Sequence, residues 1–355
     1  MLKTAKLFVL QAAERAGGCT MVANSRWRRN RLLILCYHGV ARADEHLWNP
    51  QLYLSPALFE ERLQAICRGG FNVVPLGPAL QQLHDGELPA RSLCITFDDG
   101  FADFYSQAYP LLRKYGFPAS VYLTSYYSSH QLPVFDVMCS YLLWKGRART
   151  LDSGQFGGDL GRVKLASGET RARLTALIRH FAASEGLSSS EKDLLLSRLA
   201  TELGVDYGST IGSRILHIMS ADELRQLDPA LVQLELHTHR HRVPLNEELF
   251  KQEIAENRDY IARITDGRKR PVHFCYPSGV THPGFLPWLD ELGIVSATTC
   301  EPGLSSRRCN LLSLPRFLDS STVSPVEFSA WLAGFAHKLP RRNLVHPAAS
   351  ASGLI

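Results

Sequence analysis

The stretch "LCITFDDGF", residues 93–101, decides both the fold and the place where chemistry is expected. Its apolar run is typical of a buried strand, and two adjacent carboxylates, Asp98 and Asp99, stand at its end before Gly100. Glycine leaves room for a tight turn. Successive residues of an extended chain point to opposite faces, so one carboxylate can face a metal while its neighbour faces a water molecule. The alternative is an acidic helix start or an Asx turn.

Strand and helix patterns alternate on both sides of this stretch. Ser55 and Pro56 supply the start signals of one helix, because serine caps a helix and proline fits its first position. Repeated strand-helix units predict an α/β barrel with its active site at the C-terminal ends of the strands. The predicted strands are 32–36, 71–76, 92–97, 117–124, 231–236, 271–276 and 294–299, and the predicted helices are 55–70, 103–115, 246–264 and 284–292.

Five segments are expected along the chain. Residues 1–31 form an amphipathic and basic N-terminal segment, and residues 341–355 form a flexible tail. The barrel takes the two parts 32–129 and 217–340. Between them, residues 130–216 carry helical patterns and a glycine-rich loop without a convincing strand, so a helical insertion is predicted there.

The composition is that of a globular, enzyme-sized chain of 355 residues, of which 45% are hydrophobic and 21% charged. The net charge of +5 comes partly from two local clusters, residues 25–31 and 338–342, rather than from a uniformly basic surface. This distribution argues against nucleic-acid binding. The first cluster either forms a solvated face or makes a peripheral contact with anionic lipid headgroups.

Three features bear on the cellular compartment. The apolar run 7–10 is too short for an export signal, and no run of 18 apolar residues predicts a transmembrane helix. The eight cysteines include no CxxC pair, and nothing indicates a disulfide framework. We expect a cytoplasmic protein in a reducing compartment, associated with the membrane if the basic cluster binds lipid.

A second polar cluster, "LELHTHRH", follows another predicted strand. His237 and His241 are four residues apart, a spacing that places two imidazoles on one face of a helical turn. Two histidines and one carboxylate form a common three-ligand set for catalytic zinc, with one position left for water. The alternative is a pair of surface histidines. His239, between them, is expected to point elsewhere, as a residue that supports the site or faces the substrate.

In this order, "ITFDDGF", "HTHRH" and "FCYPSG" resemble the first three motifs of the polysaccharide deacetylases, the NodB-homology group of carbohydrate esterase family four. The resemblance covers residues 32–335 apart from the insertion, and it implies a distorted (β/α) barrel of the NodB-homology type. It also implies that Asp98 is the general base and that Asp99, His237 and His241 hold a divalent metal, Zn²⁺ or another such as Co²⁺. Such a metal lowers the pKa of a bound water to about 7 and polarises an amide carbonyl.

The chain departs from the family pattern in its third motif. Cys275 stands where many relatives have an arginine, and Ser278 stands where they have a tyrosine, as in a variant found in exopolysaccharide deacetylases. The backbone N–H of Ser278 is expected to complete an oxyanion hole, since that contact needs no particular side chain. Tyr276 is grouped with it as a substrate-binding candidate.

The late Leu-x-His motif, which supplies the general acid in relatives, is also missing from the barrel part 217–340. His38 follows the first strand at its C-terminal end and is the candidate for protonating the leaving nitrogen. The alternative is a histidine packed at the barrel mouth. Arg316 either binds an acidic group of the substrate, orients Asp98 in place of the absent arginine, or forms a structural ion pair.

These residues predict a metal-dependent hydrolase that removes N-acetyl or similar N-acyl groups from an amino sugar. The expected partner is a cell-envelope polysaccharide or a lipid-linked saccharide precursor. Two alternatives stay open. An O-acetyl esterase would tolerate loss of the acid, because an alkoxide leaves more easily than an amine. A non-catalytic saccharide-binding barrel would explain Cys275 and Ser278, although such a protein has no need of Asp98 as a base.

Overall fold

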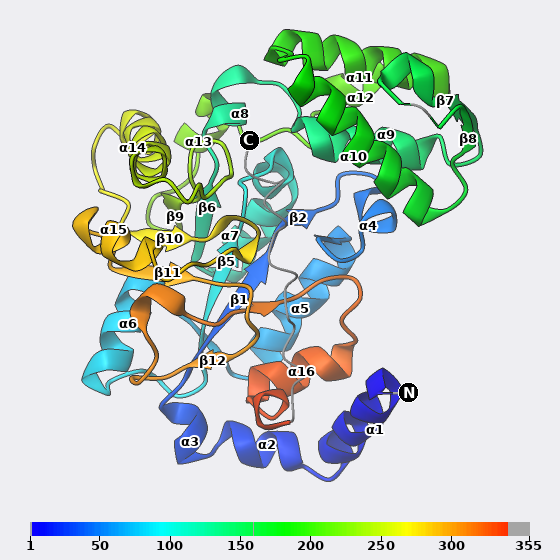
Figure 1. Cartoon of the computed structure of the whole chain (residues 1–355). Helices are drawn as coiled ribbons and strands as arrows, with labels where there is room; N and C mark the ends of the chain where they lie inside the picture. The colour runs from blue at the N-terminus through cyan, green and yellow to red at the C-terminus, as the bar shows by residue number, and fades with distance from the viewer. Residues whose placement is uncertain (1, 159, 340–355) are drawn as a thin grey trace. The chain divides into compact units, whose positions relative to one another are not determined.

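The computed structural model describes residues 2–158 and 160–339, which fall into two compact units (Figure 1). The first unit comprises the described residues up to Tyr126 and those from Ala221 onward, and the second is Tyr127–Ser220. The second unit therefore begins and ends within a few residues of the predicted insertion. The predicted flexible tail, residues 341–355, lies outside the described residues.

The first unit is built on a nine-stranded sheet in the order β11-β10-β9-β6-β5-β1-β12, with β4 beside β5 and β13 beside β1. Every pairing in it is parallel except that of β12 with β1. The sheet curls into a half-barrel, which confirms the predicted α/β barrel. The strands are β1 Leu32–Tyr37, β4 Asn72–Val73, β5 Ser92–Phe97, β6 Ala119–Leu123, β9 Val232–Leu236, β10 His273–Cys275, β11 Ser296–Thr298, β12 Leu304–Ser305 and β13 Phe317–Leu318.

Helices flank this sheet (Figure 1). The predicted cap of α5 is confirmed, since Ser55 Oγ accepts a hydrogen bond from the N–H of Leu58 at 3.2 Å and Pro56 opens the helix. The helices of this unit are α1 Leu2–Arg15, α2 Gly18–Ala23, α3 Arg26–Arg29, α4 Glu45–Trp48, α5 Pro56–Arg68, α6 Leu76–Asp85, α7 Tyr109–Tyr115, α13 Ala221–Arg225, α14 Glu247–Ile264, α15 Phe285–Glu291 and α16 Pro325–Ala333, and a π-helical turn, Phe104–Ala108, precedes α7.

The strand predicted over 71–76 is only partly correct. The structure keeps two of its residues in β4 and starts helix α6 at Leu76. Pro75 caps this helix with an extended backbone, because proline cannot donate to a strand ladder but fits a helix start. Leu76, Ala79, Leu80 and Leu83 recur at helical spacing and are buried against the sheet, a pattern that indicates α6 in the sequence.

The register of β1 and β5 decides which side chains face the interior of the half-barrel. The two strands pair in parallel with Cys36 opposite Thr96, and both strands are buried along their whole length. Because side chains alternate along a strand, Phe97 faces outward to the ring of Phe104, at 4.8 Å between centroids. The next residue, Asp98, then faces the interior.

The second unit contains helices and one short hairpin. The hairpin pairs β7, Thr150–Asp152, with β8, Arg162–Lys164, in antiparallel fashion. The expectation of an insertion without strands was therefore wrong, because three-residue strands with only Leu151 buried leave no readable alternation. The helices are α9 Phe135–Lys145, α10 Gly168–Ser184, α11 Ser189–Leu203 and α12 Tyr207–Gly212, and α8 Tyr126–His130 lies at the boundary of the unit.

Among the described residues, no helix combines the length and the apolar composition that crossing a bilayer requires.

Candidate metal and proton-transfer site

The paired carboxylates diverge at the end of β5, as the alternation of an extended chain predicts. Asp98 continues the strand, with its N–H donating to the carbonyl of Tyr37 at 2.9 Å. Asp99 then takes the left-handed conformation (φ 66°), and so does Gly100 (φ 81°). A Cβ on Gly100 would lie 2.6 Å from Leu123 Cδ1, so glycine is required there for space as well as for backbone conformation. This turn points the two carboxylates at different partners.

Asp99 faces the two histidines that were predicted as its fellow ligands. Its Oδ1 lies 3.3 Å from Nε2 of His237 and 3.3 Å from Nε2 of His241. Tetrahedral zinc takes nitrogen and oxygen ligands at about 2.0–2.1 Å, which places two such ligands about 3.3 Å apart. Both distances to Asp99 therefore match an edge of a coordination tetrahedron, the three ligand atoms lie within 4.8 Å of one another, and the donor set fits a divalent cation.

The protonation of Asp99 and His241 also suits a metal, whereas a cation would have to displace a proton from His237: burial lowers its pKa, but Cys275 and Asp99 raise it well above the usual value. Burial raises the pKa of Asp99, but the charge of His241 and a hydrogen bond from His237 lower it more and hold it at about 2. Burial lowers the pKa of His241 to about 4, so its imidazole is neutral at pH 7. An ionised carboxylate and a neutral imidazole are the forms that bind metals.

His237 is oriented by its second ring nitrogen. Its Nδ1 lies 2.8 Å from the carbonyl oxygen of Cys275, which fixes Nδ1 as an N–H donor and directs Nε2 at Asp99 Oδ1, where a bound cation would replace the Nε2 proton. His237 directly follows β9, as predicted. The expected helical turn is wrong, because residues 237–242 form a loop in which Thr238 (φ 63°) and His241 (φ 55°) are left-handed. The loop, rather than a helix face, brings the two imidazoles together.

Asp98 lies in a separate, buried setting. Arg316 donates to both of its oxygens, from Nη1 to Oδ1 and from Nη2 to Oδ2, each at 2.7 Å. The thiols of Cys36 and Cys275 each lie 3.5 Å from Oδ2. Burial raises the pKa of Asp98, but the charge and hydrogen bonds of Arg316 lower it more, and the net pKa falls below the usual range of a carboxyl. Asp98 is therefore an ionised and oriented acceptor at neutral pH.

Arg316 takes the role of orienting Asp98, one of three expected for it. Its Nε donates to the carbonyl of Thr299 at 3.0 Å, and its two remaining N–H groups face Thr96 Oγ1 at 3.3 Å and Cys275 Sγ at 3.1 Å, so the guanidinium is fully engaged inside the barrel. This leaves no free donor for an acidic group of the substrate. Arg316, which directly precedes β13, thus makes the contact with Asp98 that was expected of the arginine missing at position 275.

Two other groups of potential ligands occur among the described residues, and both contain Asp98. One is Cys36, His38 and Asp98, and the other is Asp98, His237 and Cys275. Since Arg316 already pairs with Asp98, a cation in either group would be repelled by the positive charge of the guanidinium. The group around Asp99 has no such competitor and is the better cation site.

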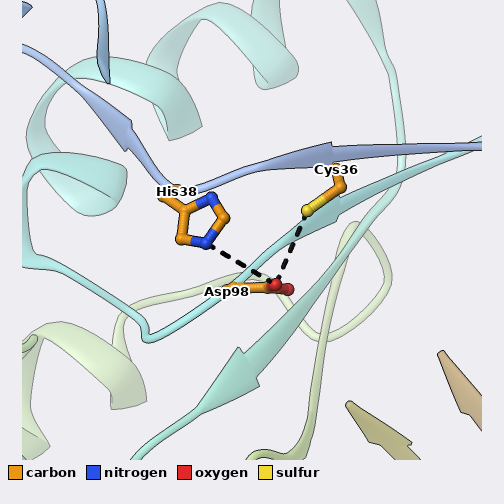
Figure 2. A group of neighbouring side chains, drawn as sticks. All are labelled: Cys36, His38 and Asp98. Atoms are coloured by element: carbon orange, nitrogen blue, oxygen red, sulfur yellow. Dashed lines mark hydrogen bonds and ion pairs between the residues drawn. The ribbon is translucent and has the colours of Figure 1, made fainter. Parts of the chain in front are cut away.

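His38 comes directly after β1 and turns its Nε2 toward Asp98 Oδ2 at 3.9 Å (Figure 2). Figure 2 shows Cys36 and His38 directed at the same carboxylate from one strand, two residues apart. The side chain of His38 is 15% exposed, so its ring reaches the surface of the site. Nδ1 of His38 has no hydrogen-bond partner among the described residues. The role of His38 as the acid stays a prediction.

The remaining candidates divide between surface and core. Ser278 is exposed, follows β10 closely and has a left-handed backbone (φ 55°). Its oxyanion role stays a prediction. Tyr276 is buried and donates its hydroxyl to the carbonyl of Leu312 at 2.9 Å, which makes it a packing residue and not a substrate contact. His239 Nδ1 lies 2.8 Å from Ser125 Oγ, so this histidine connects the loop to Ser125.

The ion pair between Arg316 and Asp98 is expected to carry a large share of stability. Arg316→Met should lower the free energy of unfolding by about 3–5 kcal/mol, because it leaves a buried carboxylate without its cation. Urea denaturation at pH 7 measures this change. The matched control is Arg225→Met, which breaks the exposed pair with Asp222 (3.0 Å) and should cost at most about 1 kcal/mol. Equal losses in the two variants would contradict the assignment.

The same pair predicts a pH dependence. The folded-state pKa of Asp98 is depressed, so the pairing contributes stability above the ordinary carboxyl pKa of about 3.9 and loses it as the pH falls below that value. The difference between wild type and Arg316→Met should therefore shrink when the denaturation is repeated under acid conditions.

Comparisons with known proteins agree with this geometry. Residues 85–154 match the family model described as polysaccharide deacetylase. YxkH of Bacillus subtilis (strain 168), whose name assigns it to the polysaccharide deacetylases, is 30% identical over 94 residues, which are 26% of this chain and 32% of that protein. A poly-β-1,6-N-acetyl-D-glucosamine N-deacetylase of Staphylococcus aureus (strain MSSA476) is 28% identical over 110 residues, 28% of this chain and 37% of that protein.

The chain thus spans about a third of the length of these curated relatives. A solved structure, the deacetylase PplD of Streptococcus pyogenes in complex with acetate, shares the fold over 84% of this chain and 96% of that chain, with a TM-score of 0.55 and 18% sequence identity. The resemblance carried by the three motifs is confirmed to this extent: residues 85–154 match the polysaccharide deacetylase model, and the half-barrel has the NodB-type fold of solved deacetylases.

Proposed function

We propose that this protein is a metal-dependent N-deacetylase acting on N-acetylated amino sugars of an envelope polysaccharide or its precursor. The proposal rests on the closeness of two groups of side chains. A three-ligand group lies beside a second, ionised carboxylate, and atoms of Asp98 and His237 lie within 4.8 Å of each other. The names of the matched relatives support the substrate class, since two of the matched names specify a polysaccharide and a poly-N-acetylglucosamine.

Asp99, His237 and His241 would hold the metal, and their spacing favours zinc. When bound, a divalent cation of this kind acts as a Lewis acid that polarises the amide carbonyl and makes water more acidic. A fourth, open position is usual in catalytic zinc sites with three protein ligands. The partial exposure of the His241 side chain, 37%, supports an open position on the side of the surface.

Asp98 would accept the proton of the attacking water at Oδ2. Arg316 keeps this carboxylate ionised and fixed, so that little reorganisation is needed at the moment of transfer. The low pKa that results makes Asp98 a weak base. Proton transfer to it therefore requires a water molecule whose own pKa would be lowered by the bound cation. The N–H of Ser278 would then donate to the developing oxyanion.

His38 would protonate the departing nitrogen from Nε2. Its Nε2 lies 3.9 Å from Asp98 Oδ2, and the 15% exposure of its side chain gives the ring contact with solvent. An amine leaves poorly unless it is protonated. This requirement separates an N-deacetylase from an O-acetyl esterase, in which the leaving alkoxide depends less on an acid.

The acid role gives a selective prediction. His38→Ala should keep bound metal and slow amide substrates by roughly 10²-fold or more, the usual range of acid–base catalysis, while activated esters lose far less. Rates of release from an N-acetylated saccharide and from an aryl acetate measure the contrast. If amide and ester rates fall by the same factor, His38 only positions the substrate or the loop.

The whole proposal is tested by incubating zinc-loaded protein with a panel of N-acetylated saccharides and lipid-linked precursors and following free amine by mass spectrometry. Matched O-acetylated saccharides form the second arm. Amine release dependent on metal supports the N-deacetylase. Acetate release from the O-acetyl arm alone identifies the esterase, and saccharide binding without turnover in either arm identifies a non-catalytic barrel.

A further inference from the structure

The loop that carries the two histidines has a backbone that needs external support. Thr238 and His241 are both left-handed, with φ of 63° and 55°. Non-glycine residues seldom adopt this conformation and keep it only where the surroundings enforce it. The distance between the two imidazoles depends on these two residues, so whatever holds them also sets the spacing of the ligands.

One support comes from Glu253 on α14, a carboxylate that is only 1% exposed. Its Oε2 accepts from the backbone N–H of Arg240 at 2.7 Å. Its Oε1 accepts from Arg240 Nη1 at 3.1 Å and from Arg242 Nε at 2.7 Å. Its backbone carbonyl accepts from the N–H of His239 at 3.0 Å. One glutamate thus contacts positions 239, 240 and 242 of the loop, on both sides of the ligand His241.

The second support is Asn257, one helical turn further along α14 and fully buried. Its Oδ1 accepts from the backbone N–H of His237 at 3.0 Å. Its Nδ2 donates to the carbonyl of Leu123 at 2.9 Å and to Ser125 Oγ at 3.0 Å. Asn257 therefore ties the first histidine ligand to the end of β6, the strand next to the one that carries Asp99.

We propose that Glu253 and Asn257 form a two-point clamp on α14 that sets the separation of His237 and His241 and thereby the metal affinity. This inference rests on the metal site of the proposed function. Residues four apart on a helix lie on the same face, and these two direct their polar groups to the ends of the ligand loop. They are positioning residues, since neither touches the metal.

The chemistry of the pair argues against a role in packing alone. A buried carboxylate and a buried amide lower stability unless they are fully bonded, and apolar residues of similar size serve packing as well or better. Among the described residues, the side-chain hydrogen bonds of Glu253 all go to the ligand loop. The clamp therefore lowers the stability of the fold and, in return, fixes the geometry of the ligand loop.

The test compares Glu253→Gln and Asn257→Leu with wild type and with Glu248→Gln, an exposed glutamate of the same helix. Zinc affinity is measured by competition with a chromophoric chelator, and Co²⁺-loaded protein is compared by visible absorption, which reports coordination geometry. Loss of a supporting hydrogen bond weakens metal binding by about 10–100-fold. We expect a loss on that scale for Asn257→Leu, a smaller loss for Glu253→Gln, altered Co²⁺ bands in both, and no change in the control.

Thermal unfolding of the metal-free forms separates geometry from stability. If Asn257→Leu does not fold, the milder Glu253→Gln, which keeps the shape of the side chain and one acceptor oxygen, decides the question. Folded variants with wild-type affinity and wild-type Co²⁺ bands would overturn the clamp. A wild-type protein that binds neither metal would instead defeat the proposed metal site, so the two failures are distinguishable.

Discussion

His237→Ala is expected to lose the bound metal and the activity together. His237 is buried, its Nε2 lies 3.3 Å from Asp99 Oδ1, and its other nitrogen is fixed by a backbone carbonyl. With three protein ligands, removal of one leaves too few donors to hold a cation, so affinity should fall well beyond the roughly 10–100-fold cost of losing an outer partner. Metal content after dialysis against a weak chelator, measured beside turnover, checks the prediction.

Asp99→Ala and His241→Ala should behave in the same way, and His239→Ala serves as the matched control. His239 lies in the same loop but directs its ring to Ser125, so its variant should retain most of the metal. A His237 variant that keeps stoichiometric zinc at wild-type affinity would show that the ligands have been assigned wrongly. Loss of metal only from the control would point to the same conclusion.

The second large effect concerns Asp98. Asp98→Asn keeps the shape of the side chain and removes its capacity to accept a proton, so turnover should fall by roughly 10²-fold or more while the metal stays bound. Zinc content and single-turnover rates on an N-acetylated saccharide measure the two properties separately. Near-normal turnover with bound metal would refute the role of Asp98 as base.

This experiment needs a stability control, because Arg316 would be left as a buried cation without its carboxylate. A double variant, Asp98→Asn with Arg316→Gln, removes both charges and should recover part of the lost stability without recovering turnover. Recovery of turnover in the double variant would mean that the single variant failed through unfolding and not through loss of the base.

Most of the site could be predicted because its residues stand at strand ends, where the alternation of side chains is readable. Asp98, His38 and His237 each directly follow a strand, and the barrel rule brings those ends together. The same alternation also applies to Cys36, which lies two residues before His38 and points to the same side. Its contact with Asp98 could therefore also have been predicted from the sequence.

The rest depended on tertiary structure. The approach of Arg316 to Asp98 joins residues 218 positions apart, and no local pattern distinguishes this from the other roles considered for that arginine. The helical spacing of His237 and His241 suggested a helix, yet the contacts from α14 hold a loop. The clamp itself was missed because Glu253 and Asn257 look like ordinary polar residues of an amphipathic helix.

The position of the second unit in the chain has a consequence for how the protein folds. β6 and β9 are neighbours in the sheet, with Ala119 opposite Val232, although the whole of Tyr127–Ser220 separates them in sequence. Closing so long a loop adds only modestly to the entropic cost, but contacts between distant residues form slowly. Asp99 and His237 lie on opposite sides of that gap, so the proposed ligand set is completed only after the two halves of the sheet have joined, and a metal bound there would stabilise only the joined state.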